Sequence, residues 1–304
     1  MVVYDLKSLQ LTEIKENTVV ALGTFDGCHK GHASVLLNAF YKAKEQKLKS
    51  VAYVLDTSAV KGQALIMSLD EKIKAIRKLG IDYVALEELG NVCGLSGEEF
   101  VRDVLIGSLR AKFATCGFNY RFGKGAVFNT SDLTRFFKNN GGSVQISEEV
   151  TLDGVPVSST LLRGFIENGE VERLLSVSSP YSICAEVIKG KGLGSMHGFA
   201  TINQQIPEGK VVPKKGVYIT ECEIGEDVYP AITNIGYRPT TDGENSYLNV
   251  ETHIIGYTGN LYSSWLRVNF YKYLREEKRF NSIDELKAQI DRDKEAATTY
   301  FRGH

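Results

Sequence analysis

The chain has 304 residues, of which 43% are hydrophobic and 24% are charged, and its formal net charge at pH 7 is −1. These values are typical of a globular protein large enough for two domains and a substantial buried core. A net charge this close to zero argues against a general affinity for nucleic acid or an anionic membrane, so any phosphate would be bound by a local site.

The sequence also favours a protein of the reducing cytoplasm. Its N-terminal segment mixes acidic residues and lysines with apolar ones and lacks the apolar core of a signal peptide. No apolar run approaches the roughly 18 residues that cross a bilayer. The cysteines are odd in number, widely dispersed and without a CxxC pair, which argues against a disulfide framework or a cysteine zinc cluster. They are Cys28, Cys93, Cys116, Cys184 and Cys222.

The first half alternates short β-rich runs with charged helical stretches. Two capping boxes, Ser68 with Glu71 and Ser96 with Glu99, precede amphipathic segments and mark helix starts. Strands separated by helices of this length predict a parallel, doubly wound sheet. The predicted strands are residues 19–23, 50–55, 82–86 and 111–117, with a weaker fifth at 143–146.

From about Tyr181 the pattern changes to short strands separated by glycine and proline turns, which predicts a small antiparallel β-barrel. The chain closes with a predicted terminal helix that Ser282 and Glu285 would open as a third capping box. We place the domain boundary at a Ser-Ser-Pro turn, which gives domains of residues 1–178 and 179–304. The apolar face of the terminal helix would consist of Ile283, Leu286, Ile290 and Ala297.

The stretch GTFDGCHKGH, residues 23–32, lies where the first buried strand turns into a helix. In an open parallel sheet, ligands bind beyond the carboxyl ends of the strands, where a helix N-terminus offers free amides to anions. The glycines permit close backbone approach there, and His29 and His32 would donate hydrogen bonds to phosphate oxygens. Two alternatives stay open: a zinc site with Cys28, which lacks a plausible fourth ligand, and purely structural histidines.

Three segments in this order resemble one enzyme family. GTFDGCHKGH is similar to the GxFDGxHxGH signature of the adenylyl- and cytidylyltransferase superfamily, in the form found in bacterial bifunctional riboflavin kinase/FAD synthetases. GFNYRFGKG (residues 117–125) resembles that family's GxDFRFG segment, and VSSTLLRGFIENGEVERLL (residues 157–175) resembles ISSTxIRxxLxxGDVExA. The resemblance implies a Rossmann-like nucleotidyltransferase domain, an FAD synthetase, in the first half.

The same resemblance implies roles for individual residues. His29 and His32 would be catalytic, stabilising charge at the reacting phosphorus, and Asn119 would lie on the flavin side. The implied nucleotide-binding residues are Gly23, Phe25, Asp26, Gly31, Arg121, Ser159, Thr160 and Arg163. The last three fit physically, because two hydroxyl residues would open a helix whose free amides converge on one anion, and an arginine follows one turn later. A merely capped helix would give the same SSTxxR pattern.

The second half resembles the riboflavin kinase domain of the same family in several ordered segments. VYPAITNIGYRPTT (residues 228–241) is similar to YxxVxNIGxRPTF, and LNVETHIIGYTGNLYSSWLRVNF (residues 248–270) to VEVHLLDFxGDLYGxxLxVxF. LREEKRFNSIDELKAQIDRD (residues 274–293) is similar to LRxExKFxSxxxLxxQIxxD. Several matching segments in the right order make chance similarity an unsatisfactory explanation.

By this resemblance Thr201 and Asn203 would hold magnesium and the ATP phosphates, and Glu251 would activate the ribityl 5′-hydroxyl. Magnesium prefers hard oxygen ligands, and phosphoryl transfer needs a base near the attacking hydroxyl, so these assignments are chemically consistent. Gly190 would bind nucleotide, and Arg275 nucleotide or flavin. From the residues alone, Glu251 could equally be a solvated carboxylate of the barrel, and Arg275 a surface ion pair.

Several segments depart from the family pattern. The xTFxPHP segment reads YVLDTSAV at residues 53–60, and Asn119 replaces the aspartate of GxDFRFG. GRxLGFPTAN reads GSMHGFATIN at residues 194–203, where Ser195 replaces the arginine and removes a bidentate phosphate donor.

The resemblance implies a bifunctional enzyme that phosphorylates riboflavin to FMN with Mg-ATP and then adenylylates FMN to FAD, releasing pyrophosphate. Its expected partners are riboflavin, FMN and ATP, with no nucleic acid and no membrane, and the sequence sets no oligomeric state. The departures leave two alternatives open. One is an enzyme that keeps a single activity, and the other is a non-catalytic flavin or nucleotide sensor, which Ser195 favours.

Overall fold

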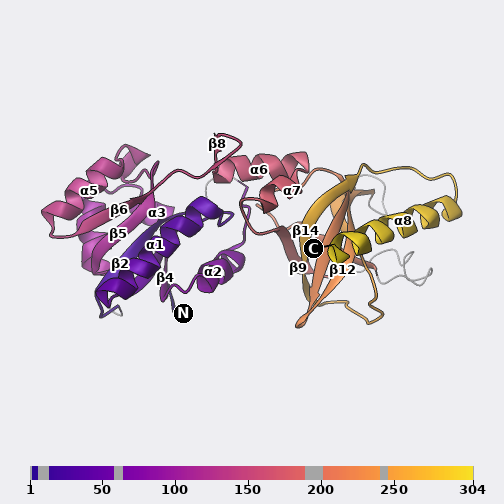
Figure 1. The fold of residues 1–304 in the computed structure, drawn as a ribbon, viewed down its shortest axis with the longest axis horizontal. Helices are drawn as coiled ribbons and strands as arrows, with labels where there is room; N and C mark the ends of the chain where they lie inside the picture. Colours follow the sequence, from indigo (N-terminus) through magenta and orange to yellow (C-terminus); the bar gives the residue numbers. More distant parts are fainter. Residues whose placement is uncertain (1, 6–13, 58–63, 189–200, 240–245, 304) are drawn as a thin grey trace. The chain divides into compact units, whose positions relative to one another are not determined.

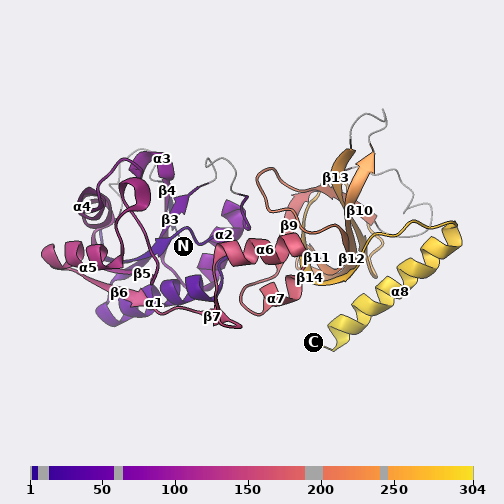
Figure 2. The same cartoon turned by 90° about the horizontal axis from the view of Figure 1, so that it is seen from above.

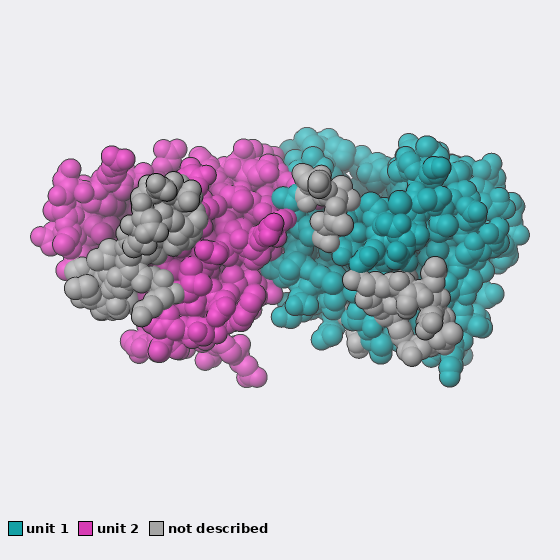
Figure 3. Space-filling view, turned by 180° about the vertical axis from the view of Figure 1, so that it is seen from behind, with its two compact units in different colours: residues 1–161 teal, residues 162–304 magenta. Residues whose placement is uncertain are grey.

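The structure is a computed structural model that describes residues 2–5, 14–57, 64–188, 201–239 and 246–303. The chain forms two compact units, residues 1–161 and 162–304, which Figure 3 colours separately. The division falls within helix α6 (Ser159–Asn168), whereas the domain boundary placed at residues 178 and 179 follows the next helix, α7 (Val171–Leu175). That boundary stays a prediction.

The first unit is built on a parallel sheet whose strand order reverses in the middle. Its strands lie in the order β1-β4-β3-β2-β5-β6, and every neighbouring pair is parallel. The predicted doubly wound sheet is therefore confirmed, and an edge strand, β1, is added that the sequence pattern did not indicate. The strands are β1 (Val2–Asp5), β2 (Thr18–Gly23), β3 (Lys49–Asp56), β4 (Tyr83–Glu88), β5 (Ala111–Gly117) and β6 (Ser143–Ser147).

Helices cover both faces of this sheet because its strands are nearly continuous apolar runs that project apolar side chains from both faces (Figure 1). In β2, Val19 and Ala21 pack with α1 and α2 in one core, whereas Val20 and Leu22 pack with η1 and α5 in the other. The helices are α1 (Lys30–Gln46), α2 (Leu69–Lys78), α3 (Leu89–Val92), α4 (Gly97–Glu99), the π-helical segment η1 (Phe100–Ser108), the 3₁₀ turn η2 (Lys124–Ala126) and α5 (Thr130–Asn139).

Both capping boxes predicted for this unit are present. At the start of α2, the Ser68 hydroxyl accepts the backbone N–H of Glu71, and the Glu71 carboxylate accepts that of Ser68. Ser96 and Glu99 make the same reciprocal pair at α4. A short antiparallel hairpin then leads toward α6, formed by β7 (Thr151–Leu152) and β8 (Val155–Pro156).

The second unit is an antiparallel sheet that curls toward a barrel (Figure 2). Its strands lie in the order β10-β13-β12-β11-β14-β9, and all neighbours are antiparallel. The two edges meet where Ile188, just after β9, forms a bridge with Asn203 of β10, as the predicted small barrel requires. The strands are β9 (Tyr181–Glu186), β10 (Thr201–Gln205), β11 (Gly216–Ile224), β12 (Asp227–Pro239), β13 (Ser246–Ile254) and β14 (Trp265–Arg275).

The terminal helix α8 (Ile283–Arg302) packs on one face of β11 and β12. Ile290 and Ala297 lie in this contact, as predicted. The predicted apolar face is wrong at its start, because Ile283 and Leu286 are 58% and 39% exposed. The first turns of α8 project beyond the strands, so nothing in the sheet is available to cover them (Figures 1 and 2).

The capping box predicted at the start of α8 is only half formed. The Ser282 hydroxyl accepts the backbone N–H of Glu285, as predicted. The Glu285 carboxylate accepts the N–H of Asn281 instead of that of Ser282. Both of these N–H groups precede the first helical turn, so a single carboxylate can satisfy either one, and here it bonds to the earlier.

The cysteines and the helix lengths bear on the expectations about disulfides and membrane spans. All five cysteines are described, and each is a free thiol. Within the described ranges, no helix has both the length and the apolar character that crossing a membrane requires.

Candidate active sites

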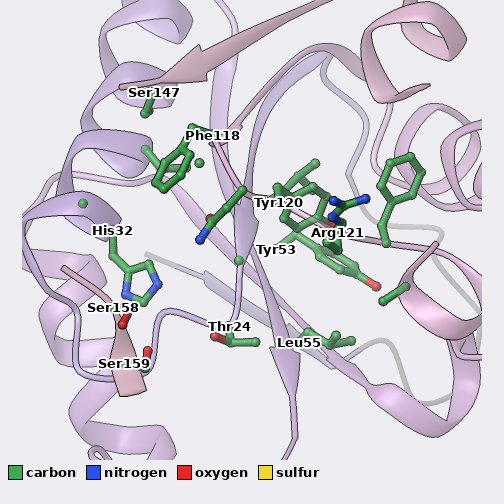
Figure 4. Close-up of a pocket in the computed structure, with 18 of the residues that line it drawn as sticks. Thr24, His32, Tyr53, Leu55, Phe118, Tyr120, Arg121, Ser147, Ser158 and Ser159 are labelled. Carbon is green, nitrogen blue, oxygen red and sulfur yellow. The ribbon is translucent and has the colours of Figure 1, made fainter. Parts of the chain in front are cut away.

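A cavity of about 580 Å³ lies at the carboxyl ends of β2, β3 and β5, where the strand order of the first unit reverses. This reversal is the place where open α/β sheets bind ligands, and the volume is in the range of small-molecule sites. In Figure 4, His32, Ser158 and Ser159 lie at one end, and Tyr120 and Arg121 lie at the other. The cavity therefore has a polar end beside α1 and an aromatic end beside β5.

The turn after β2 holds the chain in backbone conformations that few side chains adopt. Phe25, Gly27 and Cys28 have φ angles of 52°, 80° and 37°. A positive φ is unfavourable for phenylalanine, and such strain is typically found where the surrounding structure imposes it. The Phe25 ring lies in the apolar core and against Gly23, where a Cβ would come within 3.0 Å of it. Phe25 thus shapes the turn and is not among the residues that line the cavity.

Asp26 ties this turn to two other segments. Its buried carboxylate accepts hydrogen bonds from the backbone N–H groups of Ile66 and Met67, just before α2. Its backbone oxygen accepts a hydrogen bond of 2.8 Å from the Ser159 hydroxyl, at the start of α6. Asp26 does not line the cavity, so its observed contacts hold the turn between the starts of the two helices.

His29 and His32 form a stacked pair at the start of α1. His29 is the N-cap, and its Nδ1 accepts the backbone N–H of His32 at 3.3 Å. The two ring centroids are 3.8 Å apart and the planes 19° apart. A Cβ at Gly31 would lie 3.1 Å from the His29 ring, so this glycine leaves room for the imidazole. Because Nδ1 of His29 is an acceptor, the proton of the neutral ring is on Nε2.

The histidine pair is neutral at pH 7. Burial lowers the pKa of His29 to about 4, against the opposing effect of Asp26. Burial, His29 and the positive charge of Lys72 together hold the pKa of His32 well below its usual value. Nδ1 of His32 is buried and has no hydrogen-bond partner among the residues that the structure describes. The pair is therefore suited to donate hydrogen bonds to an anion rather than to act as a fixed cation.

The geometry does not favour the zinc alternative. Nδ1 of His29 is already bonded to the backbone of His32. Burial raises the pKa of the Cys28 thiol to about 11, which disfavours the thiolate that zinc binds. In the part of the chain that the structure describes, no three His, Cys, Asp or Glu side chains are grouped to hold a metal ion.

Ser158 and Ser159 bring the start of α6 to the polar end of the cavity. The Ser158 hydroxyl accepts the backbone N–H of Leu161, and the Ser159 hydroxyl is bonded to the turn after β2. Both serines line the cavity. Thr160 is exposed, and neither it nor Arg163 is among the lining residues.

The aromatic end of the cavity was only partly indicated by the sequence. Asn119 and Arg121 line the cavity, and Arg121 lies at its aromatic end. The Tyr120 ring stacks on Phe122 at 5.8 Å, and Tyr53 contacts the edge of another lining ring. Sequence reasoning missed Tyr53, Tyr120 and Phe122, although the first lies in YVLDTSAV and the others in GFNYRFGKG. The available signal was the presence of aromatic residues within or shortly after predicted strands.

In the second unit, three predicted residues share one face of the sheet. Strands β10 and β13 are antiparallel with Asn203 opposite Glu251 and Thr201 opposite His253. Opposed residues of an antiparallel pair have their side chains on the same face of the sheet, and so do residues two positions apart along one strand. Asn203 is buried and Glu251 is exposed. The pKa of His253 is lowered to about 4, mainly by its burial and secondly by the positive charge of Lys294.

Arg275 is held by an ion pair within the second unit. Its guanidinium contacts both carboxylate oxygens of Asp293 in α8, at 2.7 to 3.1 Å. Asp293 is 3% exposed, so the pair links the end of β14 to α8 rather than lying free on the surface. A contact of Arg275 with nucleotide or flavin stays a prediction. Gly190 and Ser195 lie outside the described residues.

Comparison with known families matches each half of the chain to a different enzyme. The family model for FAD synthetase matches residues 11–161, and that for riboflavin kinase matches residues 177–301. The first range ends at the last residue of the first compact unit.

Individual relatives match almost the entire chain. The bifunctional riboflavin kinase/FMN adenylyltransferase of Bacillus subtilis (strain 168) is 31% identical over 301 residues, covering 96% of this chain and 95% of the relative. The protein of the same name from Escherichia coli (strain K12) is 31% identical over 296 residues, 94% of each chain. The chain belongs to the family of bifunctional riboflavin kinase/FMN adenylyltransferases.

A solved structure has the same fold. A Streptococcus pneumoniae protein, described as a macrolide-efflux protein, superposes with a TM-score of 0.86 at 25% sequence identity. The superposition covers 98% of this chain and 99% of the other.

Proposed function

We propose that the chain makes FAD from riboflavin in two steps, phosphorylation to FMN and then adenylylation of FMN, each with its own ATP. The main observation in support is that each unit brings together polar side chains suited to one of the two reactions. The first unit places His29, His32 and two serines at one end of a cavity. The second places Asn203 opposite Glu251. The two family matches support the same assignment.

In the adenylyl transfer, the phosphate of FMN attacks the α-phosphorus of ATP. A P–O bond forms there, the bond to the β-phosphate breaks, and pyrophosphate leaves. His29 and His32 donate hydrogen bonds to the oxygens on which charge develops. The neutral state of both rings supports this role, because a neutral imidazole still carries one N–H for donation. The free backbone amides at the start of α1, around Gly31, would also stabilise this negative charge.

The remaining predicted residues anchor the phosphates and the flavin. Arg121 supplies a charge-assisted donor from the aromatic end of the cavity. The serines at the start of α6 bring its free amides to the polar end. Asn119, which lines the cavity, would contact the flavin side. For Thr160 and Arg163 a nucleotide contact rests on the resemblance alone.

In the kinase step, Glu251 takes the proton of the ribityl 5′-hydroxyl as its oxygen attacks the γ-phosphorus of ATP, and ADP leaves. Thr201 and Asn203 fit a magnesium ion, because a hydroxyl and an amide oxygen are the hard donors that it prefers. When bound with ATP, the ion would neutralise charge on the phosphates. The exposure of Glu251 leaves its carboxylate accessible to a substrate hydroxyl. We also propose a cytoplasmic location, which the free thiols support.

The two-step product assay tests this proposal. The purified chain with riboflavin and Mg-ATP should accumulate FMN and then FAD by chromatography. H29A or H32A should abolish FAD while FMN still forms, and E251A should block FMN while FAD still forms from supplied FMN. If neither product forms under metal-replete conditions, the enzyme assignment fails. An equal loss of both products in each variant would refute the two-site assignment.

Supplying each flavin separately also distinguishes the alternatives. An enzyme that keeps a single activity would convert only riboflavin or only FMN. A non-catalytic sensor would bind flavin without turnover.

A further inference from the structure

Tyr53 is a buried residue of the first-unit cavity, to which neither the sequence pattern nor the family matches assign a role. It lies on β3, and in the family pattern xTFxPHP its position is the unspecified first one. Its side chain is 2% exposed and lines the cavity, with Tyr120 and Arg121 at the end away from His32 (Figure 4). A ligand that fills the aromatic end of the cavity therefore meets Tyr53.

The hydroxyl of Tyr53 is a polar group in apolar surroundings. The Tyr53 ring meets the Phe100 ring edge-on, with the centroids 5.7 Å apart, and both rings belong to one hydrophobic core. The Oη atom is buried and has no hydrogen-bond partner among the residues that the structure describes. A buried hydroxyl without a partner is unfavourable and needs an explanation. A molecule bound at the aromatic end can supply the missing partner.

This hydroxyl stays protonated over the physiological range of pH. Burial raises the pKa of Tyr53, and the negative charge of Glu87 raises it further. The Glu87 carboxylate is itself buried and accepts a hydrogen bond of 2.8 Å from the side-chain amide of Asn91. Tyr53 can therefore donate one hydrogen bond to a ligand and accept another.

The side chains around Tyr53 indicate the kind of ligand that it contacts. The cavity-lining residues that also belong to its hydrophobic core, or pack against it, include Leu22, Leu55, Val92, Phe100, Tyr120 and Phe122. Such a surface suits a flat ring, whose orientation a few polar groups then fix. Both substrates of the proposed adenylyl transfer carry a ring of this kind. The flavin of FMN has carbonyl oxygens and ring nitrogens along its edge, and the adenine of ATP has ring nitrogens and an amino group.

We propose that Tyr53 is a specificity-determining residue of the first unit, whose hydroxyl hydrogen-bonds to the polar edge of a substrate's heteroaromatic ring at the aromatic end of the cavity. The inference rests on the proposed adenylyl transfer. Because the partner of the hydroxyl is the ligand, removing the hydroxyl should weaken substrate binding without weakening the fold.

The kinetic test uses Y53F, which removes the hydroxyl and keeps the ring. In FAD formation from supplied FMN, Y53F should raise the KM for one substrate about five- to thirtyfold, because one hydrogen bond to the bound ring is lost. The kcat should change much less. A rise confined to FMN identifies the flavin as the ring that Tyr53 binds, and a rise confined to ATP identifies the adenine. Y41F is the matched control, because it removes an exposed hydroxyl outside the cavity and should leave both KM values unchanged.

The stability of the first unit separates this role from a structural one. Amide hydrogen exchange of peptides in residues 1–161, read across a denaturant series, gives the unfolding midpoint of this unit. Y53F should not lower that midpoint, because Oη has no partner within the described residues. A lowered midpoint would show that the hydroxyl bonds within the fold and would overturn the inference.

Unchanged KM values, or an equal rise for both substrates, would also overturn the inference. Failure of the unsubstituted chain to make FAD from FMN would instead overturn the proposed adenylyl transfer. The two failures are therefore distinguishable.

Discussion

At the residue scale, the stacked imidazoles of His29 and His32 have an observed structural role and a proposed chemical one. Nδ1 of His29 caps α1 by accepting the His32 N–H, which leaves its Nε2 proton for a ligand. Their spacing in the sequence indicated a phosphate site at a helix start. Their stacking and lowered pKa values depend on burial by the surrounding fold, so the sequence could not indicate them.

The pKa of His29 predicts how stability depends on pH. The pKa is lowered to about 4 in the folded chain, from 6.5 when unfolded. Unfolding therefore takes up a proton between these values, and stability falls as pH decreases from about 6.5 to about 4, by about 3 kcal/mol in total. Above about pH 6.5 this group has no effect. We expect H29N, whose amide can still cap α1, to flatten the profile measured calorimetrically from pH 4.5 to 7.5. Parallel profiles of the two proteins would contradict the assignment.

At the element scale, the local sequence pattern predicted the strands and the capped helices. It did not predict which elements pair or pack with one another. The capping boxes of Ser68 and Ser96 formed as predicted because every atom involved lies within four residues. The burial of α8 was predicted less well, since periodicity identifies an apolar face but does not reveal where the sheet beneath it ends. Strand β1 was missed because its residues count as a strand only through pairing with β4.

Gln204 provides a test of how the second unit closes. Its side chain is fully buried, and Nε2 donates to the backbone oxygens of Ala185 in β9 and Leu266 in β14, at 2.7 and 2.9 Å. We expect Q204M to lower the stability of this unit by about 1–3 kcal/mol, because those bonds are lost without replacement by water. The unfolding midpoint of this unit measures this, read across a denaturant series from the amide hydrogen exchange of peptides in residues 162–304. Q205M, at the next and exposed position, should leave the midpoint unchanged. Equal shifts in the two variants would argue against the role of Gln204.

At the scale of the whole molecule, two compact units each contain one proposed site. Every residue that lines the cavity lies in residues 1–161, and the face with Asn203 and Glu251 lies in residues 162–304. Each proposed reaction therefore has its own site, and FMN is the product of one reaction and the substrate of the other.

This separation predicts complementation between inactive chains. H32A should make FMN but not FAD, and E251A should make FAD only from supplied FMN. A mixture of the two should form FAD from riboflavin after a lag in which FMN accumulates, because released FMN can bind the other chain. Chromatography of timed samples measures both flavins, with each variant alone as the control. A mixture that accumulates FMN but no FAD, although E251A accepts FMN, would show that FMN does not pass between chains.

The sequence by itself determined the two kinds of fold, the helix caps and the histidine pair, because these depend on local periodicity and on spacings of three or four residues. The resemblance added the two reactions and the residues expected to carry them. Only the tertiary structure decided what those residues contact. It placed Ser159 against the backbone of Asp26, Arg275 against Asp293 and Asn249 against Asn203. The two residues of each pair lie far apart in the sequence. Sheet register and packing bring them together, and local sequence does not determine either.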